Sequence, residues 1–347
     1  MKVASVLFVV LMTAGVAYGQ DTNPVVRANA EELTITARLH TQFNTTSADG
    51  QRGTEWMIRR ARLESGARIN DVVSGHVQME FAGNTATVMH AFMDLDFRPE
   101  LGLRVGRAFK PFGLFSRTAS TLFIPVEAGL RIRGVTGLEA YSLLAGLEYG
   151  ERGTGVQLEG AIPQAPVPVR YNVGWFEGPL AGTRGMGELD DHAFAGRIDA
   201  WPSEPMRLGL SWSRRHFVER GAGNRAVGPL IPGNAFALDF QWGTFGPGFH
   251  LMTELAVGVA DGVTEERFAS AGAWSAWRSE VANGPLKNIE PVARVSWADV
   301  SGGGLLVTPG LNLYFAERNR IMVNYDFWRP AEGDGAGSFK VMFAMWF

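Results

Sequence analysis

Residues 101–109 read LGLRVGRAF, and the chain continues from Lys110 as KPFGLFSRTAS. In the first stretch, apolar Leu103 and Val105 alternate with Arg104 and two glycines. A period of two residues is typical of a β-strand whose two faces meet different surroundings. The stretch therefore predicts a strand with one apolar face and one polar face.

The alternation stops at Lys110 and does not return before Gly150. This segment contains prolines and several glycines and has no sustained period, although the residues on both sides of it alternate. A loop of this length is uncommon in a compact domain and is usually functional. We predict that residues 110–150 form a constriction loop at the mouth of a pore.

Similar alternation recurs along the rest of the chain. Including residues 101–109, the predicted strands are 32–43, 56–69, 73–81, 89–97, 101–109, 152–162, 167–177, 191–201, 206–217, 235–242, 249–259, 268–279, 286–297, 304–315, 320–328 and 338–347. Residues 45–53 are predicted to be a polar loop. In the second and fourth strands, the pattern places Met57 and Met89 on the apolar face and Arg60 and Arg62 on the polar one.

The apolar faces of these strands indicate a membrane. Phe236 and Leu238 share a face opposite Asp239, and Phe343 lies opposite Lys340 in the same way. Lipid offers backbone groups no water, so a sheet in a bilayer must close into a barrel. Short connections alternate with long glycine-rich ones, as in bacterial outer-membrane barrels. We predict an all-β protein, a transmembrane antiparallel β-barrel of about 16 strands with short periplasmic turns and long external loops.

The N-terminus predicts export. Lys2 is followed by a short apolar run and then by small residues up to Gly19, which is the pattern of a secretory signal peptide. We expect residues 1–19 to be removed and residues 20–347 to form a single porin domain in the bacterial outer membrane. The chain has no Cys and a formal net charge of −3, and no basic tail indicates a nucleic-acid partner.

Several stretches resemble the phosphate-selective porins O and P. They include RRARLESGARIN from Arg59, the Gly-x-x-x-x-Pro-Phe-Gly motif at 106–113, and LNLYFAERNRIMVNYDFW from Leu311. The resemblance implies a homotrimer with sixteen strands per subunit and an inward-folded third external loop, here Lys110 to Gly150. It also implies passive uptake of anions such as phosphate, and recognition of the terminal Phe347 by the barrel assembly machinery.

The candidate pore residues are basic side chains of the loop and of the polar strand faces. They are Lys110, Arg117, Arg131, Arg133, Arg104, Arg60 and Arg62. Selectivity depends on which charges stand alone at the narrowest point, since paired charges contribute little to it. The alternative interpretation is that most of these arginines are neutralised by acidic neighbours on the same wall.

Motifs of other chemistries are missing from the sequence. The six His are scattered over separate strands, and there is no HExxH, GxSxG or Walker A pattern. We therefore expect no enzymatic activity, metal or cofactor, and predict a water-filled channel that passes small hydrophilic solutes and prefers anions. The alternatives are a non-conducting barrel that serves as an adhesin or envelope structural protein, and a barrel enzyme acting on lipid.

Overall fold

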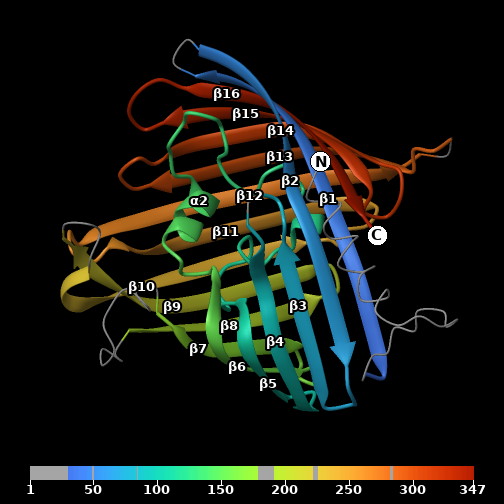
Figure 1. The fold of residues 1–347 in the computed structure, drawn as a ribbon, viewed down its shortest axis with the longest axis vertical. Helices are drawn as coiled ribbons and strands as arrows, with labels where there is room; N and C mark the ends of the chain where they lie inside the picture. The colour runs from blue at the N-terminus through green and yellow to red at the C-terminus, as the bar shows by residue number, and fades with distance from the viewer. Residues whose placement is uncertain (1–29, 49–50, 84, 179–190, 222–225, 282–283) are drawn as a thin grey trace, which may run out of the picture.

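The computed structural model describes residues 30–48, 51–83, 85–178, 191–221, 226–281 and 284–347. Across these residues the chain forms sixteen antiparallel strands that follow one another around a closed barrel (Figure 1). Closure is made by β1 and β16, where Ala37 and Phe347 exchange backbone hydrogen bonds of 2.7 and 3.0 Å. The prediction of an all-β antiparallel barrel of about sixteen strands is confirmed.

The strands are β1 (Glu32–Ala48), β2 (Gln51–Arg68), β3 (Val73–Glu80), β4 (Thr87–Arg98), β5 (Leu101–Phe109), β6 (Arg152–Ile162), β7 (Val169–Glu177), β8 (His192–Ser203), β9 (Met206–Arg220), β10 (Ala226–Trp242), β11 (Gly248–Asp261), β12 (Glu266–Glu280), β13 (Asn288–Asp299), β14 (Gly304–Tyr314), β15 (Arg320–Pro330) and β16 (Ala336–Trp346). Two short helices, η1 (Ser120–Leu122) and α2 (Ala140–Gly146), lie between β5 and β6. Within the described ranges, no helix combines the length and apolar character needed to cross a bilayer. The predicted signal peptide, residues 1–19, falls outside these ranges.

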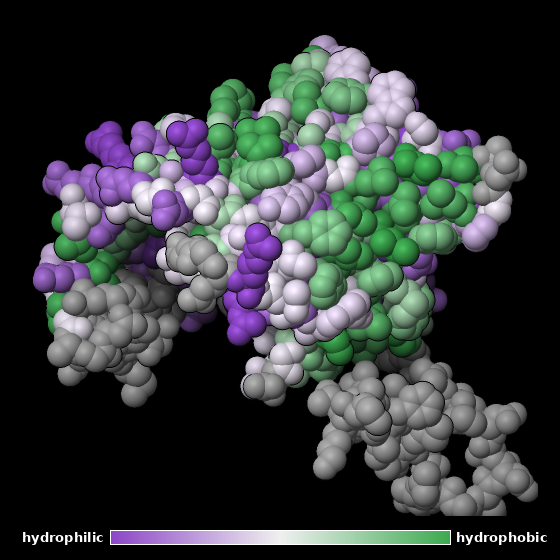
Figure 2. Space-filling model, turned by 90° about the horizontal axis from the view of Figure 1, so that it is seen from above, coloured by the Kyte–Doolittle hydropathy of each residue, from purple (hydrophilic) through white to green (hydrophobic). Residues whose placement is uncertain are grey.

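The two faces of the sheet differ as the alternation predicts. In β10, Phe236 and Leu238 are 53% and 54% exposed, whereas Asp239 of the same strand is 2% exposed. In β16, Phe343 is exposed and Lys340 is buried. Hydrophobic residues cover a broad part of the outer surface, and hydrophilic residues gather toward one end of the face shown in Figure 2. The apolar face thus points outward and the charged face points into the lumen.

The strands extend further than the hydrophobic pattern predicts. The prediction of a loop over residues 45–53 is wrong for its described part, because β1 continues to Ala48 and β2 begins at Gln51. Likewise, β10 begins at Ala226 rather than Ala235. Backbone pairing continues beyond the apolar part of these strands, where polar side chains no longer alternate with apolar ones.

Two β-bulges change the direction of predicted side chains. Where β2 pairs with β1, Ile58 and Arg60 have partners on β1 and Arg59 between them has none. As a result, Met57 pairs with the lumen residue Gln42. Opposite β3, the register similarly skips Met89. A bulge adds one residue to a strand and reverses the alternation beyond it. The predictions that Met57 and Met89 face outward are therefore wrong.

Candidate pore site

The two ends of the segment between β5 and β6 contact each other. Lys110 is buried, and its Nζ donates a 2.8 Å hydrogen bond to the carbonyl oxygen of Glu148. Burial lowers the pKa of the Lys110 ammonium to about 8. Gly113 has a φ of +71°, a conformation that favours glycine, and a Cβ there would lie 2.8 Å from Glu254 Oε2. These contacts turn the chain into the lumen directly after β5.

Inside the barrel this segment packs on the lumen face of β9–β16, which we call the covered wall (Figure 1). The Phe115 ring stacks on Trp274 of β12 with centroids 4.3 Å apart. Further along, Ile132 packs with Leu306 and Trp328 of β14 and β15. Apolar contacts therefore fasten the loop along one side of the lumen.

Charges on the covered wall are paired and buried. Arg294 Nη2 lies 2.8 Å from Asp326 Oδ1, and both side chains are 1% exposed. Asp326 also pairs with Lys340. Arg278 makes a 2.9 Å contact with Glu290 in the same way. On this wall, the structure agrees with the alternative interpretation, in which lumen arginines are neutralised by acidic neighbours.

The middle of the loop reaches across to β1 and β2. The Glu127 carboxylate accepts hydrogen bonds of 2.6 and 2.9 Å from Arg59, and its backbone oxygen accepts one of 2.7 Å from Arg294 of β13. Burial by itself raises the pKa of the Glu127 carboxyl, but the charges of Arg59 and Arg60 outweigh burial and hold the pKa at about 2. We call the Arg59–Glu127 contact the loop latch. The bulge at Arg59 makes it possible, because it turns two consecutive arginines toward the lumen.

A path of three cavities follows the opposite side of the lumen, the face of β1–β7, which we call the open wall. The central cavity has a volume of about 410 Å³. It shares Met89, Glu151 and Arg152 with a loop-side cavity of about 410 Å³, which Lys110 and Glu148 line. It shares Arg104, Arg117 and Asn172 with a turn-side cavity of about 730 Å³ beside the short β4–β5 turn. Because they share lining residues, the three cavities lie next to one another along the open wall, and we call this series the route.

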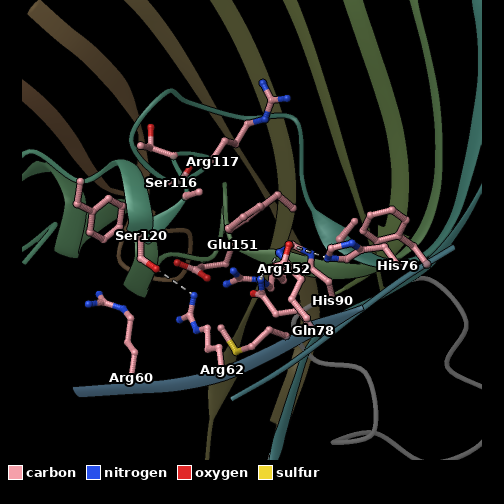
Figure 3. Close-up of a pocket in the computed structure, with 18 of the residues that line it drawn as sticks. Arg60, Arg62, His76, Gln78, His90, Ser116, Arg117, Ser120, Glu151 and Arg152 are labelled. Carbon is pink, nitrogen blue, oxygen red and sulfur yellow. Dashed lines mark hydrogen bonds and ion pairs between the residues drawn. The ribbon is translucent and has the colours of Figure 1, made fainter. Parts of the chain in front are cut away.

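The central cavity carries an excess of basic side chains. Its described lining includes seven arginines, Arg38, Arg59, Arg60, Arg62, Arg104, Arg117 and Arg152, and two glutamates, Glu64 and Glu151. Figure 3 shows Arg60 and Arg62 extending from β2 toward the loop at Ser120, and Arg152 lying beside His90. The described linings of the loop-side and turn-side cavities contain equal numbers of basic and acidic residues, three of each and four of each. The bias is therefore confined to the middle of the route.

Several of these arginines have carboxylate partners that do not line the cavity. Arg62 contacts Glu80 at 2.6 Å, and Arg104 contacts Asp94 at 2.7 Å. Arg152 differs, since within the described part of the chain no carboxylate oxygen lies within 4.0 Å of its guanidinium. Its partners are His90 Nε2 at 3.1 Å and the Phe109 ring at 3.9 Å. At Arg62 and Arg104, the guanidinium groups thus line the central cavity, whereas Glu80 and Asp94 do not.

The structure brings together most, but not all, of the predicted pore residues. Arg60, Arg62, Arg104 and Arg117 line the central cavity, and Lys110 lines the loop-side one. By contrast, Arg131 and Arg133 are exposed and line none of the three cavities.

Sequence reasoning did not name Arg38, Arg59 and Arg152 as candidates, although they line the central cavity. The alternation of the first strand already placed Arg38 on its polar face. The paired arginines at 59–60 are a signal for a bulge, since strict alternation would send one of them into lipid. Arg152 begins a strand directly after the loop. In the described residues, no group of His, Asp or Glu is arranged to hold a metal ion.

Comparison with known proteins places this architecture among bacterial porins. No protein-family model matches the sequence, and no curated protein is similar enough to match it. Among solved structures, the anion-selective porin from Comamonas acidovorans superimposes with a TM-score of 0.64 at 12% identity, over 91% of this chain and 99% of that one.

Two other solved structures agree. OprB of Pseudomonas putida gives a TM-score of 0.63 at 10% identity, over 91% of this chain and 94% of that one. OmpF of Salmonella typhi, solved with daunomycin, gives 0.59 at 11% identity, over 92% and 99%. At such low identities the similarity concerns the fold, and the chain has the fold of an outer-membrane porin.

Proposed function

We propose that this protein is an outer-membrane porin, a water-filled channel through which small hydrophilic solutes diffuse passively. The series of adjacent cavities along the open wall supports this proposal. A barrel of about sixteen strands is wide enough for an aqueous channel, whereas one of eight strands is filled by its own side chains. The loop fastened to the covered wall narrows this lumen and sets an upper limit on solute size. No chemical step is required.

We further propose that the channel prefers anions. The observation that carries this proposal is the lining of the central cavity by seven arginines and two glutamates. In a narrow passage with low-dielectric walls, charges of one sign focus the field and attract counter-ions. The carboxylates behind Arg62 and Arg104 reduce this field, whereas Arg152 forms no ion pair within 4.0 Å in the described chain and is neutralised less directly. Phosphate is one anion that the family resemblance suggests.

The assembly of the protein is part of the same proposal. The family resemblance suggests a homotrimer embedded in outer-membrane lipid. It also suggests that the barrel assembly machinery recognises Phe347. The side chain of Phe347 is 65% exposed at the end of the chain, while its backbone pairs with Ala37. This geometry leaves the terminal ring accessible after the barrel has closed.

Current recordings from the purified protein in planar bilayers test the proposed function. We expect stable open channels, and a reversal potential of the anion-selective sign in a KCl gradient. A reversal potential of the opposite sign would contradict the anion preference and leave the channel function in place. Bilayers that contain the protein but carry no current would instead favour a non-conducting barrel with an adhesive or structural role.

A further inference from the structure

Arg152 has hydrogen-bond donors that no other described group uses. Its Nε donates to His90 Nε2 at 3.1 Å, and its guanidinium carbon lies 3.9 Å from the centroid of the Phe109 ring. In the described part of the chain, its two terminal nitrogens make no hydrogen bond, and neither of them is fully buried. Because Arg152 lines the central cavity, these two accessible donors remain for a solute.

Two aromatic neighbours orient this guanidinium. It lies over Phe109, and His90, which accepts its Nε hydrogen bond, packs against the same ring with centroids 4.9 Å apart. Arg152 and Phe109 are also cross-strand partners on β6 and β5. A guanidinium presents its donors as a planar fork that matches the two oxygens of a carboxylate. The free end of Arg152 is therefore suited to a carboxylate group.

The loop contributes an aromatic ring to the same cavity. Tyr141 of α2 lines the central cavity, is only partly buried, and packs against the cluster that includes Phe115 and Phe123. Among the described residues, its hydroxyl has no hydrogen-bond partner and is not fully buried. No described guanidinium lies over its ring, unlike those of Phe92 and Phe109. The ring of Tyr141 is therefore not occupied in orienting an arginine.

Electrostatics place Tyr141 near the free end of Arg152. Burial raises the pKa of the Tyr141 hydroxyl to about 12, and the largest effects of charge on it come from Glu151, Arg60 and Arg152. All three charged residues line the central cavity. Since such effects fall with distance, Tyr141 and Arg152 belong to the same part of that cavity.

Met89 and Phe109 add apolar surface to this part of the route. Both line the central cavity and are partly exposed. The lumen face of an outer-membrane barrel is polar, so apolar side chains that keep accessible surface there require an explanation. A solute with an apolar body would remove this surface from water, which is favourable.

These features define a class of solute. An inorganic anion can use the guanidinium fork but offers nothing to the rings. An aromatic carboxylate brings two oxygens for the fork and a flat apolar ring, and paired aromatic rings gain more than their buried area alone provides. The cavity volume of about 410 Å³ lies within the range of about 300–1,000 Å³ that is typical of small-molecule pockets, so a carboxylate with one ring fits.

We propose that the central cavity contains a binding site for aromatic carboxylates, in which Arg152 binds the carboxylate and Tyr141 contacts the ring. Met89 and Phe109 form the apolar surroundings of the bound solute. This inference rests on the proposed channel function and names one class of anion that the channel favours.

The experiment compares benzoate with cyclohexanecarboxylate, which has the same charge and a six-carbon ring without a π-system. Each potassium salt is added to planar bilayers that contain the full-length protein in KCl, and the reduction of the chloride current gives a half-blocking concentration. An anion bound in the route obstructs chloride. We expect benzoate to block at a concentration about threefold lower than cyclohexanecarboxylate, an effect within the range of one aromatic pair.

Variants separate the ring from the fork. Tyr141→Leu should raise the half-blocking concentration of benzoate toward that of cyclohexanecarboxylate, whereas Tyr141→Phe keeps the ring and should preserve the preference. Arg152→Gln should weaken block by both acids by the same factor, because both lose the same fork. Tyr325→Leu is the matched control, since Tyr325 of β15 is 36% exposed and lines none of the three cavities, and it should leave the preference unchanged.

The inference is overturned if the two acids block the wild type equally, if Tyr141→Leu keeps the preference for benzoate, or if Tyr141→Phe or Tyr325→Leu loses it. A failure of the proposed function gives a different result, namely no current or a preference for potassium in the KCl gradient. An anion-preferring channel that both acids block equally rejects only the inference. If no variant inserts, the wild-type comparison decides.

Discussion

The open wall and the covered wall belong to one continuous sheet, but their arginines are placed differently. On the covered wall, Arg294 and Arg278 are buried against carboxylates, and Arg294 also donates to the loop at Glu127. On the open wall, Arg62 and Arg152 line the central cavity. A lumen arginine therefore either stabilises the wall through a buried ion pair or lines a cavity. The position of the loop decides which of the two it does.

The largest difference should appear in stability. Asp326→Ala leaves Arg294 and Lys340 buried without their shared carboxylate, and the loss of one partner from a buried ion pair costs about 3–5 kcal/mol. We expect a correspondingly lower midpoint of urea unfolding in lipid vesicles. Asp94→Ala is the control on the open wall, because Arg104 is more exposed there and keeps Glu159 at 3.3 Å. Equal losses for the two variants would refute the distinction between the walls.

The loop latch joins the two walls and should have the next largest effect. Glu127→Gln removes the charge-assisted hydrogen bonds from Arg59. Such bonds contribute about 1.5–3 kcal/mol to the free energy of unfolding. We expect a lower free energy of unfolding and larger fluctuations of the open-channel current, since the loop is less firmly held.

The latch also predicts a dependence on pH. The pKa of Glu127 is lowered from 4.5 to about 2 in the folded protein. The stability it contributes is therefore fully present above pH 4.5 and is lost as the pH falls toward 2. Wild-type channel fluctuations should stay constant from pH 7 to 5 and grow below 4.5. If Glu127→Gln shows the same growth below 4.5, another group is responsible.

On the open wall, charge reversal should change selectivity more than stability. Arg152→Glu replaces a cation that, in the described chain, has no carboxylate within 4.0 Å and is shared by two cavities of the route. We expect the chloride to potassium permeability ratio to fall by about tenfold, which corresponds to about 1.4 kcal/mol. Reversal potentials in a KCl gradient measure this ratio. An unchanged ratio would mean that the solutes take a different route.

The smallest effect is expected at Arg131 and Arg133. Arg131→Glu and Arg133→Glu make the same change of charge as Arg152→Glu, but at exposed loop positions that line none of the three cavities. We expect the permeability ratio to change by less than about twofold, because exposed charges are screened by salt. A change as large as that of Arg152→Glu would place these residues in the pore after all.

The architecture was predictable from the sequence because residues of a membrane strand alternate between lipid and lumen, and this alternation is visible in the sequence. Residues such as Phe236 and Asp239 must lie on opposite sides of the sheet, and closure follows from the lack of water in lipid. The pattern failed at Arg59 and Met89, where a bulge reverses the alternation without any change in composition. It also failed beyond residue 43, where the strands continue through polar sequence.

The sequence by itself determined the period of two, the oily outer face, the number of strands and the position of the long loop, because each depends on residues that are close together in the chain. The tertiary structure alone decided which arginines face the route. That choice depends on partners far away in sequence, such as Glu127 for Arg59 and His90 for Arg152. It depends equally on the side of the lumen against which the loop packs, which no local pattern encodes.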